Sequence, residues 1–139
     1  MDTNILVYAH REELPKHALA AKRLVGLAEG SGRWALPVFV LSEFLRIITH
    51  PRLFHPPFSA SEACLAASRI LASPSLSLLH PGPAFAKLLL EAIEEAPATG
   101  NLVFDAQIVA VCREAGVRTL LTEDRDFARF RAFSTERLS

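Results

Sequence analysis

The sequence predicts an α/β fold in which helices cover both faces of a short, mostly parallel central sheet, as three layers in the order α/β/α. Half of the 139 residues are hydrophobic, which is enough for a core of the chain's own. The strand-like apolar runs are short and alternate with longer helical patterns, and strands separated by helices pair in parallel. No repeat or linker divides the chain, so we expect a single domain over residues 1–139.

In the first half of the chain, Pro and Gly mark where the predicted elements begin and end. Pro15 can open a helix, and Gly30 and Gly32 end it. The run WALPV is too short and too apolar for anything but a buried strand. In chain order we predict a helix from Pro15 to Gly30, a strand over 34–38, a helix over 38–50 that ends before Pro51, and a helix over 61–72 that Ser59 or Ser61 caps.

The second half continues this alternation of helices and strands. Pro97 and Gly100 break one helical pattern, and Gly116 ends the next. In chain order we predict a strand and turn over 76–82, a helix over 83–95, a helix over 104–116, a buried strand over 117–122, a short helix over 124–130 and a last short strand around Ala132 and Phe133.

The composition limits the classes of partner. Fifteen basic residues balance fifteen acidic ones, so a polyanion must be held by a local patch rather than by net charge. No apolar run is long enough to span a bilayer and no leader is visible, so we expect a cytoplasmic protein with no membrane partner. Cys64 and Cys112 lie far apart, and we interpret them as reduced thiols on helix faces.

Four carboxylates are candidates for a functional site, namely Asp2, Glu43, Asp105 and Asp124. Each has an ordinary explanation when taken alone. Asp2 and Asp124 suit helix caps. Glu43 suits the solvated boundary of a helix, and the helix dipole favours an acid at Asp105. Their joint placement is more informative, because three of them follow strands or open helices, and ligands of parallel sheets gather beyond the carboxyl ends of the strands.

These acids lie in four segments, DTNILVYA, SEFLRI, NLVFDAQIVAV and LLTEDRDF, which together resemble a PIN-domain ribonuclease of the VapC toxin type. The resemblance covers nearly the whole chain, in the right order and spacing. It implies an acidic metal-binding quartet of Asp2, Glu43, Asp105 and Asp124. It also implies that Asn4 and Thr122 are supporting polar positions, and that ILVYA, which periodicity alone allows as a strand, lies in a helix. Asp126 and, more distantly, Glu123 are alternatives to Asp124 as the ligand from the last loop.

The activity that the resemblance implies is that of a metal-dependent endoribonuclease, the toxin of a type II toxin–antitoxin pair. The implied partners are an RNA substrate, a cognate antitoxin and a second copy of the chain in a homodimer. Crowded carboxylates repel one another unless a cation neutralises them. Hard oxygen ligands suit Mg²⁺ or Mn²⁺, which lower the pKa of a bound water and stabilise charge on a phosphodiester's transition state.

Two features depart from the family pattern. In the family, several apolar residues precede the aspartate of D-T-N and form a central strand, whereas only Met1 precedes Asp2 here. Either the true start lies upstream or this strand is severely truncated. Phe104 and Gln107 flank Asp105 where relatives often carry histidine, a difference that can alter substrate choice.

Two other classes of function compete with the nuclease. A PIN-fold scaffold that has lost catalysis would be marked by the loss of a carboxylate, and none is missing. A magnesium-dependent phosphohydrolase would need D-x-D near the start, and a receiver domain would need a Lys beyond Lys87. The basic residues nearest to the acids in sequence, Arg46, Arg125 and Arg129, could hold RNA, although ordinary solvated charges explain them more simply.

Overall fold

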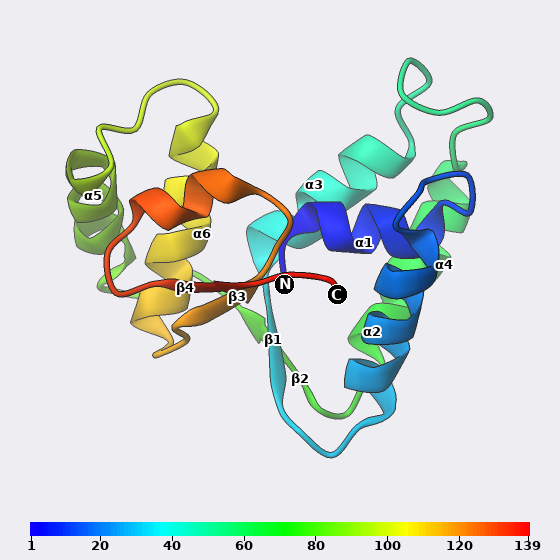
Figure 1. Ribbon diagram of the computed structural model, residues 1–139, viewed down its shortest axis with the longest axis horizontal. Coiled ribbons are helices and arrows are strands. Elements are labelled where there is room, and N and C mark those ends of the chain that lie inside the picture. Colours follow the sequence, from blue (N-terminus) through cyan, green and yellow to red (C-terminus); the bar gives the residue numbers. More distant parts are fainter.

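The computed structural model describes residues 1–139 as an alternation of helices and short strands. In chain order the elements are α1 (Thr3–His10), α2 (His17–Glu29), β1 (Trp34–Pro37), α3 (Val38–Ile48), α4 (Ala60–Leu71), β2 (Leu76–Leu79), α5 (Phe85–Glu95), α6 (Leu102–Glu114), β3 (Thr119–Leu121), the 3₁₀-helix η1 (Arg125–Arg129) and β4 (Ser134–Glu136). Figure 1 shows α1 to α4 on one flank of the molecule and α5, α6 and η1 on the other, with the N-terminus between them.

The strands form two separate parallel sheets of two strands each, β1 with β2 and β3 with β4. The first two residues of the chain link these two sheets. The Met1 ammonium donates to the Ala35 carbonyl of β1 at 3.2 Å, and the Asp2 amide donates to the Leu121 carbonyl of β3 at 2.9 Å. The α/β class and the parallel pairing are therefore confirmed. The predicted central sheet is divided in two, and Met1 and Asp2 lie between the facing edges of β1 and β3.

The facing edges of β1 and β3 bound a cleft of about 530 Å³, which we call the apolar cleft. Met1, Ala35 and Leu121 line it, together with Leu79 from β2 and Cys112 from α6. Burial in this region lowers the pKa of the Met1 amino group, because removal from water disfavours its charged form. The apolar cleft therefore surrounds a desolvated amine with hydrocarbon.

Helix α1 begins directly after Asp2 and fixes the position of that residue. The Asp2 carboxylate accepts a hydrogen bond from the Thr3 amide at 2.7 Å, which satisfies a free donor at the helix start. Ile5 and Leu6 are fully buried. The ILVYA segment therefore packs one face of a helix against α2 and α3, as the resemblance implies and as periodicity alone does not decide.

Helices α3 and α6 carry two of the other acids. Val40, Phe44 and Ile48 are fully buried at a spacing of four residues, which turns this face of α3 into the core and leaves Glu43 at its border. Helix α6 begins at Leu102, two residues before its predicted start, and Asp105 lies in its first turn as predicted. Beyond that turn, α6 is buried over residues 108–112.

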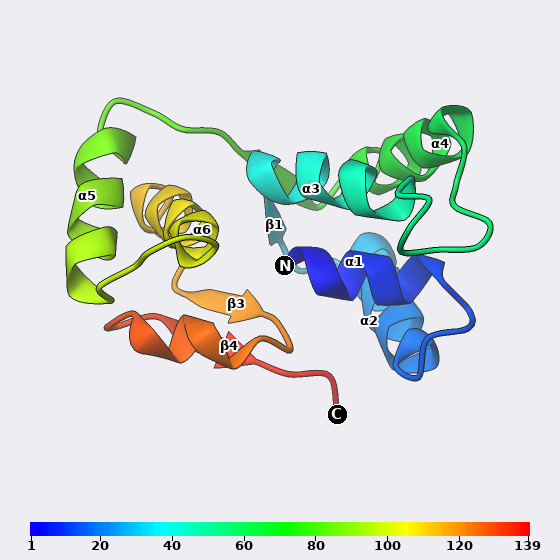
Figure 2. The same ribbon diagram turned by 90° about the horizontal axis from the view of Figure 1, so that it is seen from above.

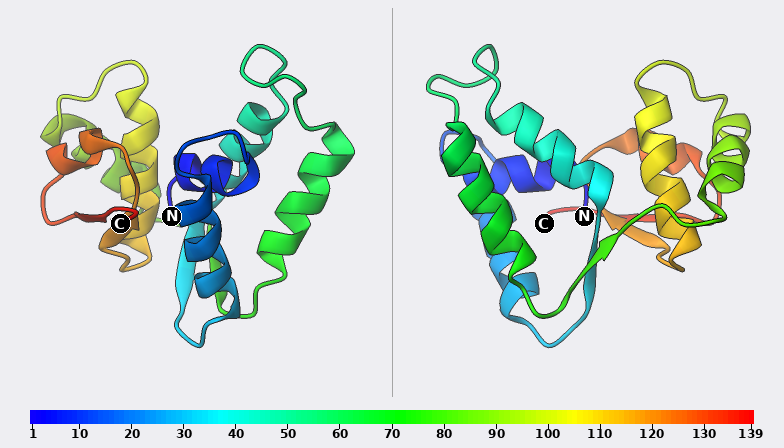
Figure 3. Two further views of the ribbon diagram at one scale, coloured as in Figure 1. Left: turned by 45° about the vertical axis from the view of Figure 1, so that its right-hand side comes forward. Right: turned by 180° about the vertical axis from the view of Figure 1, so that it is seen from behind.

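Two predicted boundaries near α5 and β4 are wrong, and each has a local cause. The sequence predicts the last strand around Ala132 and Phe133, but Ala132 has a φ of 49°, a left-handed conformation that a strand cannot include, so β4 begins after it. Helix α5 begins after its predicted start, because Glu114 of α6 accepts hydrogen bonds from the amides of Gly82 and Ala84, each at 2.7 Å. Figures 2 and 3 show α5 and α6 side by side.

Three further sequence expectations can be compared with the structure. Ser59 rather than Ser61 caps α4, in a reciprocal capping box with Glu62. Cys64 is exposed and Cys112 is buried, and both are free thiols on helices, as predicted. None of the helices is both long enough and apolar enough to cross a membrane.

Candidate functional site

The predicted acids line one pocket of about 430 Å³, which we call the acidic pocket. Asp2 enters it from the start of α1, Glu43 from α3 and Asp105 from the first turn of α6. Asp124 and Asp126 enter from the segment that links β3 to η1 and from the start of η1. Four parts of the chain that are far apart in sequence therefore contribute carboxylates to one cavity.

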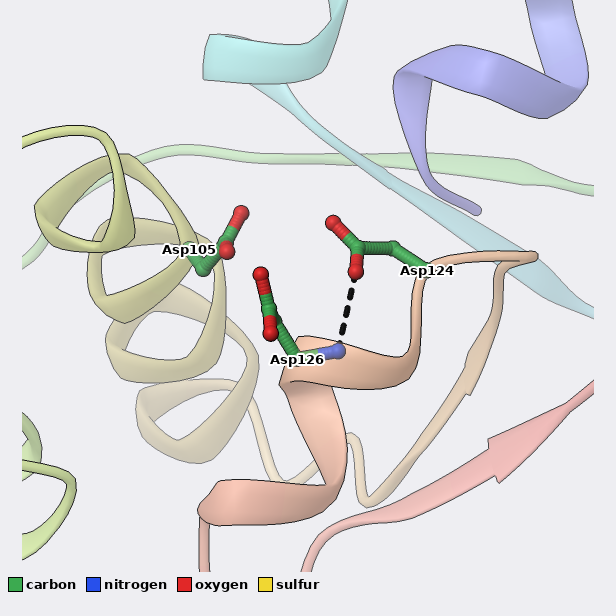
Figure 4. Close-up of side chains that lie close together, drawn as sticks. All are labelled: Asp105, Asp124 and Asp126. Carbon is green, nitrogen blue, oxygen red and sulfur yellow. Dashed lines mark hydrogen bonds between the residues drawn. The ribbon is translucent and has the colours of Figure 1, made fainter.

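Three of these carboxylates form a compact group. One oxygen from each of Asp105, Asp124 and Asp126 lies within 4.8 Å of the others. Figure 4 shows Asp105 facing the other two across the gap between α6 and η1, and a dashed line marks the hydrogen bond from the Asp126 amide to the Asp124 carboxylate, which is 2.8 Å long. Asp126, which the sequence offers as a supporting residue beside the quartet and as an alternative to Asp124, lies next to Asp124 in this group.

The buried residue Phe127 holds this loop in place. Its side chain is fully buried, and its ring lies 6.4 Å from that of Phe130 and 6.5 Å from that of Phe133. Because this anchor follows Asp126 directly, the chain turns into η1 with both aspartates on the side of α6. The T-x-D-x-D-F spacing contained this signal, since an apolar residue after the second aspartate can pin the turn.

Thr122 connects the two halves of the acidic pocket. Its hydroxyl donates to the second oxygen of Asp2 at 2.6 Å and accepts from the Asp124 amide at 3.0 Å. Thr122 is almost completely buried, and its bond to Asp2 is buried as well, whereas its bond from the Asp124 amide is partly buried. It acts as a positioning residue that fixes the orientation of Asp2 and the path of the Asp124 backbone, in keeping with the supporting role that the resemblance implies.

Glu43 lies on the α3 side of the pocket. Its carboxylate accepts a hydrogen bond of 3.2 Å from the Thr3 hydroxyl, which ties α3 to the start of α1. Glu43 also contributes to the electrostatics of Asp2 and Asp105, whose pKa values its negative charge helps to raise. It is part of the same electrostatic cluster, although it is not in the compact group of three.

The acidic pocket changes the protonation of its members. Burial first, and then the charges of Asp124, Asp2, Asp126 and Glu43, raise the pKa of Asp105 to about 7. Burial also raises the pKa of Asp2, against the opposing effect of its hydrogen bond from Thr122. Both effects have the same physical origin, because like charges withdrawn from water disfavour the ionised form. A cation in the pocket would favour the ionised carboxylates and so lower the pKa values of Asp105 and Asp2.

The donor set fits a hard divalent cation. The convergent ligands are carboxylate oxygens, which such cations prefer, and no thiol or imidazole lines the pocket. Asn4, which also lines it, has a buried amide oxygen with no hydrogen-bond donor in the chain. An unpartnered buried acceptor beside crowded carboxylates is suited to a hydrated cation, whose water ligands donate hydrogen bonds.

The remaining sequence candidates lie outside the compact group. Glu123 pairs with Lys16 and accepts from the Leu138 amide at 2.8 Å, so it is engaged away from the pocket. Arg46 lines the pocket, whereas the Arg129 guanidinium lies 3.7 Å from the Asp126 carboxylate. Sequence reasoning missed Tyr8, which lines the pocket one helical turn after Asn4.

The PIN domain family matches residues 1–132 of the chain. The chain belongs to the PIN domain family. Among its relatives, the VapC ribonuclease Mb2897 of Mycobacterium bovis is 37% identical over 131 residues, which cover 94% of this chain and 88% of that one. Ribonuclease VapC31 of Mycobacterium tuberculosis is 34% identical over 132 residues, which cover 94% and 91% of the two chains. The resemblance seen in the sequence is thereby confirmed.

A solved structure supports the PIN fold of this chain independently. A chain in the crystal structure of VapBC2 from Rickettsia felis, bound to a DNA fragment of its promoter, matches with a TM-score of 0.67. The match covers 99% of this chain and 96% of that one at 19% sequence identity. At this identity the similarity concerns the fold, which is conserved over the whole length although few side chains are shared.

Proposed function

We propose that this PIN domain is a metal-dependent endoribonuclease and the toxin of a type II toxin–antitoxin pair, acting in the cytoplasm. The observation that carries the proposal is the convergence of Asp105, Asp124 and Asp126 within 4.8 Å, in a pocket that Asp2 and Glu43 also line. The names of the relatives support it, since they are ribonucleases of the VapC type. A scaffold function has no comparable support, because every expected carboxylate is present in the pocket.

We further propose that the cation is Mg²⁺ or Mn²⁺ and that Asp2, Glu43, Asp105 and Asp124, with Asp126, hold it. When bound, the cation supplies a more acidic water and neutralises charge on the phosphodiester. The chain itself contributes by holding the carboxylates in fixed positions. Thr122 holds the Asp2 carboxylate and the Asp124 amide, so these groups do not reorganise during the reaction. The Asn4 amide oxygen can orient a water or a ribose hydroxyl by accepting a hydrogen bond from it.

Two protein partners belong to the same proposal. We propose a cognate antitoxin, supported by a fold shared with a chain from a VapBC2 complex. We also propose a homodimer, which the family resemblance implies. Light scattering after size exclusion at micromolar concentration should give twice the mass of one chain. A mass equal to one chain throughout would remove the dimer from the proposal.

RNA cleavage by the purified chain tests the central proposal. The chain is incubated with structured and unstructured RNAs in Mg²⁺, in Mn²⁺ and in excess EDTA, and the products are mapped at nucleotide resolution. We expect internal cleavage with either metal and none with EDTA, because the carboxylates alone repel a phosphate. Cleavage that persists unchanged in EDTA would contradict the role of the metal, and binding of RNA without cleavage by any metal form would favour a scaffold.

A further inference from the structure

A second pocket of about 340 Å³ lies between α3 and α6 and opens beside the acidic pocket. The two cavities share Glu43, Arg46 and Phe104 as a common wall. We call the second one the side pocket. Its volume lies at the lower end of the range typical of small-molecule sites. A ligand that reaches the carboxylates can therefore extend into the side pocket without crossing open surface.

The walls of the side pocket are aromatic. Phe104 of α6 stands 59% exposed, which is unusual for a phenylalanine within a helix that is otherwise mostly buried. Phe39 of α3 faces the same cavity and is supported from behind by Phe85, with ring centroids 5.6 Å apart. Ile108 is nearly fully buried and completes the apolar lining. Such surfaces suit a flat, hydrophobic group that stacks on an aromatic ring.

Polar groups at the side pocket add directional contacts. Gln107 is half-buried, lies one turn after Phe104 and makes no side-chain hydrogen bond within the chain. Its amide presents a donor and an acceptor together, a pairing that matches the edges of nucleobases. The Ser42 hydroxyl gives its proton to the Phe39 carbonyl at 3.0 Å and so presents oxygen lone pairs to the cavity. The side pocket therefore combines stacking surfaces with groups that read a pattern of hydrogen bonds.

Arg46 stands where the two pockets meet and has no acidic partner. It takes part in none of the five ion pairs of the chain, and it is exposed. An unpaired guanidinium on this shared wall can contact an oxygen of a phosphate that bridges the two cavities. With a net charge of zero on the chain, such local positive charge is what a polyanion would need.

We infer that the side pocket binds one nucleobase of the RNA, from a nucleotide adjacent to the phosphate that the acidic pocket holds. The inference rests on the proposed function and deepens it, because it gives the enzyme a site that selects where RNA is cut. Continuity with the acidic pocket, the aromatic walls and the free Gln107 amide all favour a base. A protein segment is the other class of occupant. Its backbone can also pair with the Gln107 amide, but it does not supply the phosphate that unpaired Arg46 on the shared wall can contact.

The experiment uses short single-stranded RNAs in which one nucleotide at a time is made abasic around the cleavage site. Binding is measured by fluorescence anisotropy in Ca²⁺, which carboxylates bind and which neutralises the acidic pocket in the absence of Mg²⁺ and Mn²⁺. Cleavage is measured as kcat/KM in Mn²⁺. For the wild type, we expect one abasic position next to the cut to reduce binding and kcat/KM by about tenfold to a hundredfold, as for the loss of one stacked base. The other positions should have small effects.

Two variants assign this effect to the side pocket. In Phe104→Ala, the intact RNA should be bound and cut about as poorly as the abasic one, and the abasic substitution should add little further loss. In Gln107→Leu, the preference for one base at that position should weaken while stacking persists. Leu90→Ala on α5 is the matched control, since Leu90 is also a large apolar side chain, 63% exposed, but outside both pockets. It should behave as the wild type.

The outcomes separate the inference from the function on which it rests. If the wild type cleaves RNA but every abasic position is tolerated, or if Phe104→Ala keeps the full sensitivity, the base site is wrong and the nuclease stands. If Phe104→Ala instead lowers only the mass in light scattering, the side pocket contacts protein. If no RNA is cleaved but binding still depends on one base and on Phe104, the nuclease proposal fails and the base site stands.

Discussion

The acidic pocket and the apolar cleft meet at the first two residues of the chain, and they present opposite physical problems. Asp2 belongs to the acidic pocket, where carboxylates from four segments crowd together. Met1 belongs to the apolar cleft, where hydrocarbon and two strand edges surround a single amine. The first region has an excess of like charge, which a cation can neutralise. The second has a mostly apolar lining, which apolar groups can fill favourably, although Arg23, Arg33 and Glu136 also line it.

The two regions also differ in how pH affects them. In the acidic pocket, burial and neighbouring acids raise the pKa of Asp105 to about 7, so the folded chain holds a proton there more tightly than the unfolded chain does. In the apolar cleft, burial lowers the pKa of the Met1 amine, so the folded chain holds that proton less tightly. In the absence of a cation, ionisation of Asp105 therefore costs stability as the pH rises, whereas protonation of the Met1 amine costs stability as the pH falls.

The largest effect should come from neutralising one carboxylate of the acidic pocket. Asp105→Asn preserves shape and removes one charge, and we expect RNA cleavage to fall on the order of a hundredfold or more, as when one positioned electrostatic group is lost. The metal-free variant should fold at least as stably as the wild type, because a repelling charge is gone. Cleavage rates and thermal unfolding measure these effects. Glu91→Gln on the exposed side of α5 is the control, and cleavage by Asp105→Asn at the wild-type rate would exclude Asp105 from the site.

A smaller effect is expected at Thr122, whose hydroxyl joins Asp2 to the Asp124 backbone. Thr122→Val removes one buried and one partly buried hydrogen bond and should lower the free energy of unfolding by about 1–3 kcal/mol. Cleavage should fall about tenfold, as is usual when a residue that orients metal ligands is lost. Thr122→Ser keeps the hydroxyl and should retain most of both properties. A loss in Thr122→Ser with none in Thr122→Val would mean that the methyl group, rather than the hydroxyl, is what matters.

Adding apolar residues ahead of Met1 tests the apolar cleft. A segment of roughly five Val, Ile and Leu residues fused ahead of Met1 can pair with both strand edges, and should raise the free energy of unfolding by about 2 kcal/mol after the cost of ordering its backbone. A Gly/Ser segment of the same length is the control, since both fusions replace the buried ammonium by an amide. Chemical denaturation measures the difference. Equal stability of the two fusions would show that the cleft does not accept a strand.

The pH dependence of stability should give the smallest effect. Because the pKa of Asp105 is raised from 3.8 to about 7, its contribution is fully present below about pH 4 and is lost as the pH rises through 7. Between about pH 5 and 8, the metal-free wild type should lose about 1–2 kcal/mol relative to Asp105→Asn, after allowance for its partial exposure. The lowered pKa of the Met1 amine acts in the opposite direction in both chains, so it cancels in this difference. Urea titrations at several pH values measure it, and parallel curves would contradict the assigned pKa.

Local rules account for much of what the sequence predicts correctly. The buried spacing of Val40, Phe44 and Ile48 and the breaks at Pro and Gly are readable from neighbours in the chain, and so are most helix positions. The position of β4 is not, because Ala132 adopts a left-handed conformation that alanine rarely takes and that its neighbours in sequence do not indicate. The role of the four acids stays a prediction, although all four line one pocket.

The sequence by itself determined the α/β class, because periodicity, capping and turn residues act over a few positions, and it carried the motifs whose resemblance to the family singled out the four acids. Only the tertiary structure decided that Asp126 joins Asp105 and Asp124, that the sheet is divided around Met1 and Asp2, and that Phe104 opens a second pocket beside the first. These features depend on contacts between residues up to 120 positions apart, such as Asp2 and Thr122. Such distances are set by how helices and strands pack, and no local pattern encodes them.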